Sequence, residues 1–264
     1  MNAGIHARLR GRELRSLCRT GEFDGPTAGA AIAYAQANFV AVPADLAAHF
    51  EEFCRLNPRP CPLLETLQPG HYEPRLLAAN ADLRTDLPRY RVFRDGVCVD
   101  TPKEILDVWT HDLTAFLIGC SFTFESALLE AGLPVRHLEE SRNVPMYRTD
   151  IPCTPAGPFS AMLVVSMRPM TPEQADRAVK VTSRYERIHG SPVRVGDPEG
   201  IGINDIHQPD YGEAVTMHTG EIPVFWACGV TPLEAIMSAK PPLAITHDPG
   251  HMFVTDLLHV EFRE

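Results

Sequence analysis

Val224-Phe-Trp-Ala-Cys-Gly-Val-Thr-Pro-Leu-Glu234 is the stretch that decides the fold class. It begins as a short, continuous apolar run, which is typical of a strand covered on both faces. The run ends in Cys-Gly and continues into Thr231-Pro-Leu-Glu234, which carries a helix start signal: a hydroxyl at the N-cap, proline at the first helical position and an acid at the third. A covered strand that leads directly into a helix predicts a layered α/β fold.

The same pattern recurs along the chain. Apolar runs at 116–120, 161–166 and 243–246 are equally short and are followed by turns or helix starts. Thr101-Pro-Lys-Glu104 and Thr171-Pro-Glu-Gln174 repeat the helix start signal. Strands that alternate with helices again favour α/β layers.

The N-terminal third has its own pattern. We expect the first 60 residues to be helical, with one helix from Ala44 to Asn57 between two prolines. Arg89 to Phe93 and Val97 to Val99 are joined by Asp95-Gly96, which predicts a hairpin. Five arginines near the N-terminus are interpreted as the solvated face of a first helix. They are Arg8, Arg10, Arg12, Arg15 and Arg19.

The middle of the chain predicts a β-β-α-β block. Its strands are expected at 144–151, 161–168 and 192–195, with the helix from Pro172. We therefore assign residues 140–198 to a smaller two-layer α+β domain. It is inserted into a main α/β domain made of residues 1–139 and 199–264.

Composition excludes several classes of protein. The chain has 264 residues and a net charge of −10, which argues against nucleic acid or an anionic membrane as the main partner. No apolar run approaches the length of a membrane span, and no signal peptide is recognised. Seven cysteines without a Cys-x-x-Cys pair argue against a disulfide framework and a zinc ribbon. We expect a cytoplasmic protein with reduced thiols.

Two strand-to-helix turns are candidate anion sites, because free N–H groups and the helix dipole favour negative charge there. They are Gly119-Cys-Ser-Phe-Thr-Phe-Glu125 and Trp226-Ala-Cys-Gly-Val-Thr-Pro232. Each adds a small thiol or hydroxyl that suits a carboxylate or an oxyanion. Cys120 and Cys228 are alternatively small buried apolar residues at strand ends. The first turn lacks the Gly-x-Ser-x-Gly pattern of an esterase.

Polar side chains are dense in the extended stretch 140–150. Arg142 and Asn143, followed by Tyr147, suit bidentate recognition of a substrate carboxylate. The alternative is a solvated strand face. Asp197 ends a strand in a glycine-proline loop that lacks the dinucleotide-binding pattern, so it is either an acid or a simple turn former.

Two histidines lie four residues apart in Thr246-His-Asp-Pro-Gly-His251. The Pro249-Gly250 turn between them excludes the helical zinc-binding arrangement. His247 and His251 with a distant carboxylate remain candidate metal ligands. They are equally candidates for a general acid or base near neutral pH.

These segments resemble the D-glutamate cyclase family, whose bacterial members are described as hydro-lyases. The resemblance runs from about residue 20 to the C-terminus. Besides the turns and the histidine loop, the segments that carry it are 36–39, 57–62, 82–90, 143–148, 165–169 and 196–198. The sequence departs from the family pattern at 28–34 and at Glu213, where relatives often carry Asp. The resemblance implies a two-domain α/β fold and, for the characterised branch, conversion of D-glutamate into 5-oxo-D-proline with loss of water.

This reaction suggests roles for the candidates. Arg142 with Asn143 would anchor the α-carboxylate, and N–H groups after either cysteine, with Thr231, would stabilise an oxyanion. An imidazole or a carboxylate would move the protons. The candidate catalytic residues are Cys120, Glu125, Asp197, Cys228, His247 and His251, and the candidate substrate-binding residues are Ser121, Arg142, Asn143, Tyr147 and Thr231.

Two other classes stay open. A metal-dependent hydrolase of amides or lactams would use His247 and His251, with manganese, zinc or magnesium bound. A non-catalytic carboxylate-binding accessory protein would keep Arg142 and the helix N-termini but need no titrating group. No cofactor is required by the sequence, although a divalent metal such as manganese fits the histidine loop. The expected partner is a small carboxylic or amino acid, and a homo-oligomer is compatible with the sequence.

Overall fold

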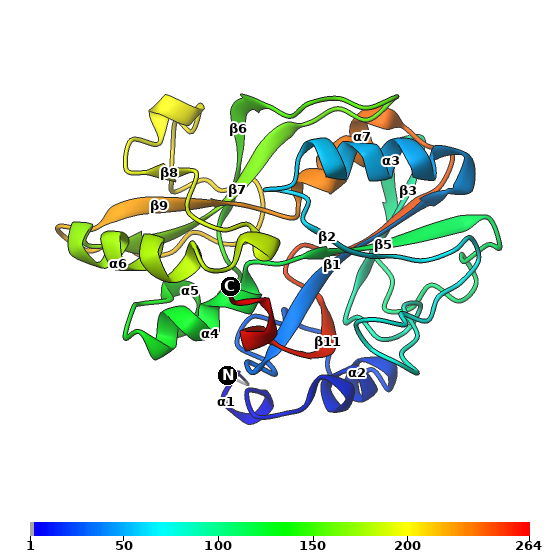
Figure 1. Ribbon diagram of the computed structural model, residues 1–264, viewed down its shortest axis with the longest axis horizontal. Helices are drawn as coiled ribbons and strands as arrows, with labels where there is room; N and C mark the ends of the chain where they lie inside the picture. The colour runs from blue at the N-terminus through cyan, green and yellow to red at the C-terminus, as the bar shows by residue number, and fades with distance from the viewer. Residues whose placement is uncertain (1–2) are drawn as a thin grey trace.

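The computed structural model describes residues 3–264 and contains two antiparallel sheets (Figure 1). The larger sheet has the strand order β2-β5-β1-β10-β3-β4, and β11 also pairs with β1. Its strands are β1 (Tyr34–Pro43), β2 (Leu63–Thr66), β3 (Tyr90–Arg94), β4 (Val97–Asp100), β5 (Leu113–Gly119), β10 (Ala244–His247) and β11 (Phe253–Leu258). The smaller sheet has the order β6-β7-β9-β8. Its strands are β6 (Met146–Pro152), β7 (Met162–Met170), β8 (Arg194–Val195) and β9 (Ile222–Ala227).

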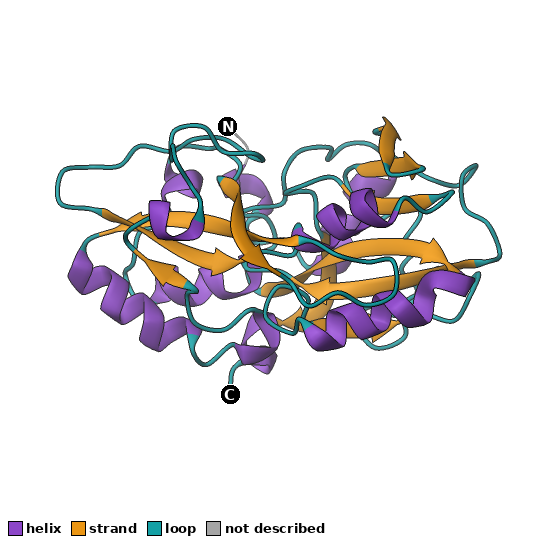
Figure 2. Cartoon of the chain, turned by 90° about the horizontal axis from the view of Figure 1, so that it is seen from above, coloured by secondary structure: helices purple, strands orange, loops and turns teal. Residues whose placement is uncertain are grey.

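Helices cover both sheets (Figure 2). The helix α2 packs on β11, α3 packs on β1 and β5, and α4 contacts both β1 and α6. The α-helices are α1 (Ala3–His6), α2 (Gly11–Arg19), α3 (Ala44–Leu56), α4 (Phe122–Glu130), α5 (Arg136–Glu139), α6 (Pro172–Thr182) and α7 (Thr231–Ala239), with short 3₁₀ turns at 186–188, 199–201 and 259–262. Among residues 3–264, no helix is long and apolar enough to cross a membrane.

The mixed α/β class is confirmed, but the covered strands belong to antiparallel sheets. The clearest correction is β1, which lies within the first 60 residues, where we expected helices. Its residues are buried almost throughout, with Gln36, Asn38 and Val40 on one face and Ala37 and Phe39 on the other. The alanines favour a helix locally, yet pairing along both edges of the strand overrides that preference.

The β-β-α-β block is present as β6, β7, α6 and β8. The smaller sheet also includes β9 at 222–227, a run that we expected in the main domain. Phe225 of β9 pairs with both Met167 of β7 and Arg194 of β8, so β9 is an interior strand of the smaller sheet. The division of the chain into two domains stays a prediction.

The three helix start signals have different outcomes. At Thr171 both hydrogen bonds of the capping box form, and α6 follows. At Thr231 a helix begins, but the hydroxyl does not cap it, because it accepts the N–H of Val164 and donates to the carbonyl of Cys228. At Thr101 the helix prediction is wrong. The carbonyl of Pro102 accepts the N–H of Tyr90, and the segment runs along β3 instead.

The arginines of α2 are less solvated than expected. Arg15 is buried, donates to the carbonyl of Val254 and forms an ion pair with Asp256. Arg19 binds the buried carboxylate of Asp86 through two nitrogens. These contacts fix α2 to the larger sheet.

Candidate active site

The two strand-to-helix turns singled out in the sequence meet at Asn38 of β1. The Asn38 amide donates to the carbonyl of Gly119, at 2.6 Å, at the end of β5. On its other side lies Gly229, where an added Cβ would come within 1.9 Å of the Asn38 amide nitrogen. Only glycine leaves room for Asn38 there, so the second turn packs directly against the amide that binds the first.

The two cysteines of these turns lie in one buried cluster. Burial raises the pKa of Cys228 to about 11 and raises the pKa of Cys120 still further. Both thiols are therefore neutral near pH 7, whereas the thiolate is the nucleophilic form. Their surroundings match the apolar alternative better than the catalytic one.

A buried ion pair lies beside the first turn. Arg168 of β7 is fully buried and donates from Nε to Glu125 Oε1 at 3.1 Å, while its Nη2 donates to the same oxygen. The other guanidinium contacts are the hydroxyls of Ser121 and Ser166, each at 3.1 Å. The guanidinium also lies over the ring of Trp226. Because α4 carries Glu125, this pair joins α4 to the smaller sheet.

His137 of α5 completes this group. Its Nε2 lies 3.1 Å from Glu125 Oε1, and its ring stacks on Phe122. Burial raises the pKa of the Glu125 carboxyl, but His137 and Arg168 outweigh burial and hold that pKa below its usual value. An ionised carboxylate thus lies behind the imidazole of His137, and the ring is held between Glu125 and Phe122.

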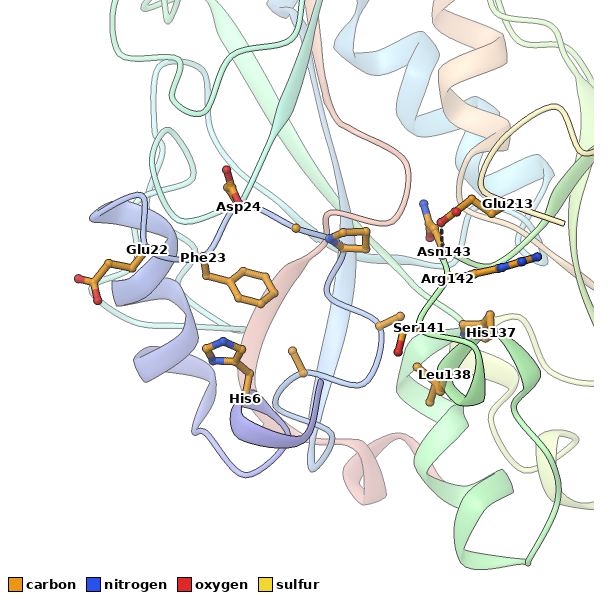
Figure 3. Close-up of a pocket in the computed structure, with 14 residues that line it drawn as sticks. His6, Glu22, Phe23, Asp24, His137, Leu138, Ser141, Arg142, Asn143 and Glu213 are labelled. Atoms are coloured by element: carbon orange, nitrogen blue, oxygen red, sulfur yellow. Dashed lines mark hydrogen bonds between the residues drawn. The ribbon is translucent and has the colours of Figure 1, made fainter. Parts of the chain in front are cut away.

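His137 also lines a pocket of about 360 Å³, here called the His137 pocket (Figure 3). Figure 3 shows His6 and Phe23 on one side of the hollow, and His137 and Ser141 on the other. The polar and charged residues that line it are His6, Glu22, Asp24, His137, Ser141, Arg142, Asn143 and Glu213. Pockets of this size accept small metabolites. The imidazole of His137 therefore lines a cavity whose wall carries both positively and negatively charged side chains.

Arg142 and Asn143 both line this pocket, but their side chains are already engaged. Arg142 donates to the carbonyl of Ala214, and Figure 3 shows its side chain directed away from Phe23. The Asn143 side chain donates to Pro249, and its N–H is accepted by Glu213. Asn143 therefore ties the pocket wall to the loop that contains His251.

His247 has a structural position. One edge of β1 changes partner from β11 to β10 between Ala37 and Val40. There the Nδ1 atom of His247 lies 3.3 Å from the nitrogen and 3.2 Å from the oxygen of Phe39, in place of a strand neighbour. Burial lowers the pKa of His247 to about 4, so the ring is neutral near pH 7.

His251 lies in the loop behind the pocket wall. Its Nδ1 is 3.2 Å from the carbonyl of Pro249 and 3.4 Å from Asp248. Burial lowers its pKa despite the nearby carboxylate. Thr27 donates its N–H to Gly250 at 2.8 Å, so the loop is clamped between Thr27 and Asn143. Among the described residues, no group of three or more His, Cys, Asp or Glu side chains gathers as a metal site.

Two candidates lie apart from the pocket. Tyr147 packs on Phe225 in another cluster and donates its hydroxyl to Ile206 at 2.6 Å. Asp197 is exposed in the loop after β8 and pairs with Arg194. The structure therefore gathers Ser121, Glu125, Arg142 and Asn143 around His137, with Cys120, Cys228, Thr231, His247 and His251 in the adjoining turns and loop.

Sequence reasoning missed His137, Arg168 and Asn38. Arg168 had a usable signal, because it is a lone charge at the end of an apolar run within a segment that carries the family resemblance. Asn38 had a similar signal in Gln36-Ala-Asn-Phe39, which was expected in a helix. His137 had none, since α5 is a single turn.

Comparison with known proteins identifies the family. Residues 114–256 match the family model described as D-glutamate cyclase. A protein of Stutzerimonas stutzeri named "Putative hydro-lyase" is 55% identical over 97% of both chains. A protein of Bacillus licheniformis, also named as a hydro-lyase, is 55% identical over 96% of this chain and 97% of its own length. A protein of Mycolicibacterium gilvum with the same kind of name is 59% identical over 88% of both chains. The chain belongs to the D-glutamate cyclase family, among relatives that are named hydro-lyases, a class of carbon–oxygen lyases.

Proposed function

We propose that the protein is a hydro-lyase that closes D-glutamate into 5-oxo-D-proline in the His137 pocket. Family membership supports the reaction class, and the observation that carries the proposal is the pocket-lining imidazole of His137 backed by the buried Glu125–Arg168 pair. A pocket of about 360 Å³ has room for a five-carbon amino acid. Enclosing the flexible chain brings its amine close to its own side-chain carboxyl, which lowers the entropic barrier to ring closure.

The reaction needs two proton transfers. The substrate ammonium must lose a proton before its nitrogen can attack the side-chain carboxyl carbon. The C–N bond then forms, the nitrogen gives up a second proton, and the side-chain oxygen takes up both protons and leaves as water when its C–O bond breaks. We assign both transfers to His137, which each time acts first as the base toward the nitrogen and then as the acid toward the departing oxygen. Glu125 lies behind the ring, with its Oε1 3.1 Å from His137 Nε2, and helps to hold it in place.

The charges of the pocket fit an amino acid. Asp24 is already paired with Lys103 at 2.8 Å, whereas Glu213 uses one carboxylate oxygen on the N–H of Asn143. The second oxygen of Glu213 is the group we assign to the substrate ammonium. Arg142 sits at the same wall and adds positive potential for a carboxylate, although its guanidinium donates to a backbone carbonyl.

The experiment is proton NMR of the purified protein with D-glutamate and, separately, with L-glutamate, each with and without manganese. We expect 5-oxoproline from the D form. His137→Gln is expected to lower the rate about 10²- to 10⁴-fold, the usual contribution of a general acid–base group. The matched control is His259→Asn, because His259 is also buried but contacts Tyr185 instead of the pocket.

Each result has a distinct meaning. Full activity of His137→Gln would remove His137 as the acid–base group. No product from either isomer would remove glutamate as the substrate, and a screen of other small amino and hydroxy acids for water loss would then test the reaction class. Strict dependence on manganese would favour the metal-dependent alternative.

A further inference from the structure

A second hollow, of about 290 Å³, lies between α4, α6 and the C-terminal residues. Three cations line it: Lys180, Arg184 and Arg263, here called the basic rim. The hollow shares no lining residue with the His137 pocket. Although the chain has a net charge of −10, the three cations outnumber the one acid, Glu130, that lines this hollow, so the local charge is positive.

The basic rim is not neutralised by side-chain ion pairs. Within residues 3–264, none of its three side chains has a side-chain carboxylate oxygen within 4.0 Å of its charged nitrogens. Arg184 donates from Nε to the main-chain oxygen of Glu264 at 3.2 Å, which leaves its terminal nitrogens for other acceptors. The acid that lines the hollow, Glu130, is exposed and lies 3.6 Å from His259.

The hollow also has a buried polar residue. Tyr185 is fully buried, lines the hollow and has its hydroxyl 3.2 Å from His259 Nδ1. The hydroxyl is thus occupied by His259, and Tyr185 forms the buried wall of the hollow. The ring of Tyr185 packs against Phe124, which fixes its position.

We propose that this hollow binds a small dianion of the phosphate class. Two guanidinium groups offer planar pairs of N–H donors that match phosphate oxygens, and the ammonium of Lys180 adds a third positive charge. The volume suits inorganic phosphate or a small phosphomonoester. The site is independent of the proposed reaction, because no residue of the His137 pocket takes part.

Isothermal titration of the full chain with inorganic phosphate tests this site, at constant ionic strength maintained with chloride. We expect saturable binding with one phosphate per chain. Lys180→Gln combined with Arg263→Gln is expected to weaken it at least tenfold. The control is Arg55→Gln combined with Arg94→Gln, which removes the same charge from exposed positions elsewhere and should leave the affinity within twofold.

Titration with phosphoglycolate, compared with titration with inorganic phosphate, shows whether the preferred ligand is a phosphomonoester or free phosphate. The site is supported whichever of the two binds more tightly. Equal weakening in both double variants would show a general charge effect and overturn the proposal. Absence of saturable phosphate binding, or tighter binding of malonate than of phosphate, would overturn it as well. Circular dichroism and the thermal unfolding midpoint of each variant verify that the fold is intact.

Discussion

His137 and His247 are both buried, yet the structure uses them differently. His137 faces a carboxylate and lines a pocket, whereas His247 replaces a missing strand neighbour beside Phe39. The sequence favoured His247, because it lies near a second histidine in a loop. The difference teaches that the role of an imidazole is determined by its partner in the folded protein more than by its neighbours in the sequence. Burial against the backbone lowers the pKa of His247 and keeps its ring neutral near pH 7, whereas the ring of His137 lies against a carboxylate.

The largest effect on stability is expected from breaking the ion pair behind His137. Arg168→Met leaves the buried charge of Glu125 without its main partner and should lower the free energy of unfolding by about 3–5 kcal/mol. Urea denaturation at pH 7 measures this. The control is Arg148→Met, whose half-exposed side chain pairs with Asp210 and Glu234, and which should cost clearly less because solvent screens these charges. An equal loss of the free energy of unfolding in both variants would show that burial of the Glu125–Arg168 pair does not contribute to stability.

The structural role of His247 predicts a pH dependence. Its folded pKa of about 4 lies below the unfolded value of 6.5, so the unfolded chain binds more protons between these values. Stability is therefore retained above pH 6.5 and lost as the pH falls toward 4, by up to about 1.4 kcal/mol per pH unit. His247→Asn should flatten this slope in urea titrations at several pH values. The exposed His71→Asn should leave the slope unchanged, and a similar change in both would contradict the assignment.

The contact between Asn143 and the loop that contains His251 offers a test with a smaller expected effect. At Gly250, φ is +87° and an added Cβ would come within 2.4 Å of Asn143 Oδ1. At Gly220, φ is +86° and nothing lies within 4 Å of an added Cβ. Both substitutions by Ala incur the backbone cost of about 1 kcal/mol, but Gly250→Ala should cost about 1–2 kcal/mol more because of the clash. Matching thermal unfolding midpoints would show that Asn143 does not clamp the loop.

The smallest effect is expected at the two thiols of the strand-to-helix turns. Cys228→Ala and Cys120→Ala remove groups that are neutral near pH 7, so turnover should change less than about threefold. Steady-state rates, and the absence of iodoacetamide labelling at Cys120 and Cys228 while the exposed Cys98 is labelled at pH 7, check this. Loss of activity in either variant, with the fold intact, would restore that cysteine as a catalytic candidate.

Local signals predicted much of the fold and part of the site. The Pro-bounded helix α3, the Asp95-Gly96 hairpin and the capping box at Thr171 depend on neighbouring residues, so the sequence was sufficient for them. The strand β1 depends on partners 70 or more residues away, and its alanines gave the opposite local preference. The Thr101 signal failed because β3 uses the carbonyl of Pro102.

Some residues of the candidate site were likewise predictable from local sequence, and others were not. Ser121 and Glu125 were found because a strand-to-helix turn is visible in the sequence. Their partner Arg168 comes from a strand in the other sheet, and His137 reaches the pair from a one-turn helix. Only the folded chain brings these side chains together, since no motif links them.

The most direct test of the account compares the rates of His137→Gln and His247→Asn with D-glutamate, measured by NMR at pH 7.5 with folding verified by circular dichroism. We predict that His137→Gln loses about 10²-fold or more of the wild-type rate, the contribution of an acid–base group. His247→Asn should stay within about threefold of the wild-type rate, because its neutral ring supports only the backbone of β1. The reverse order of rates would contradict the account and move the catalytic group to the His247 loop.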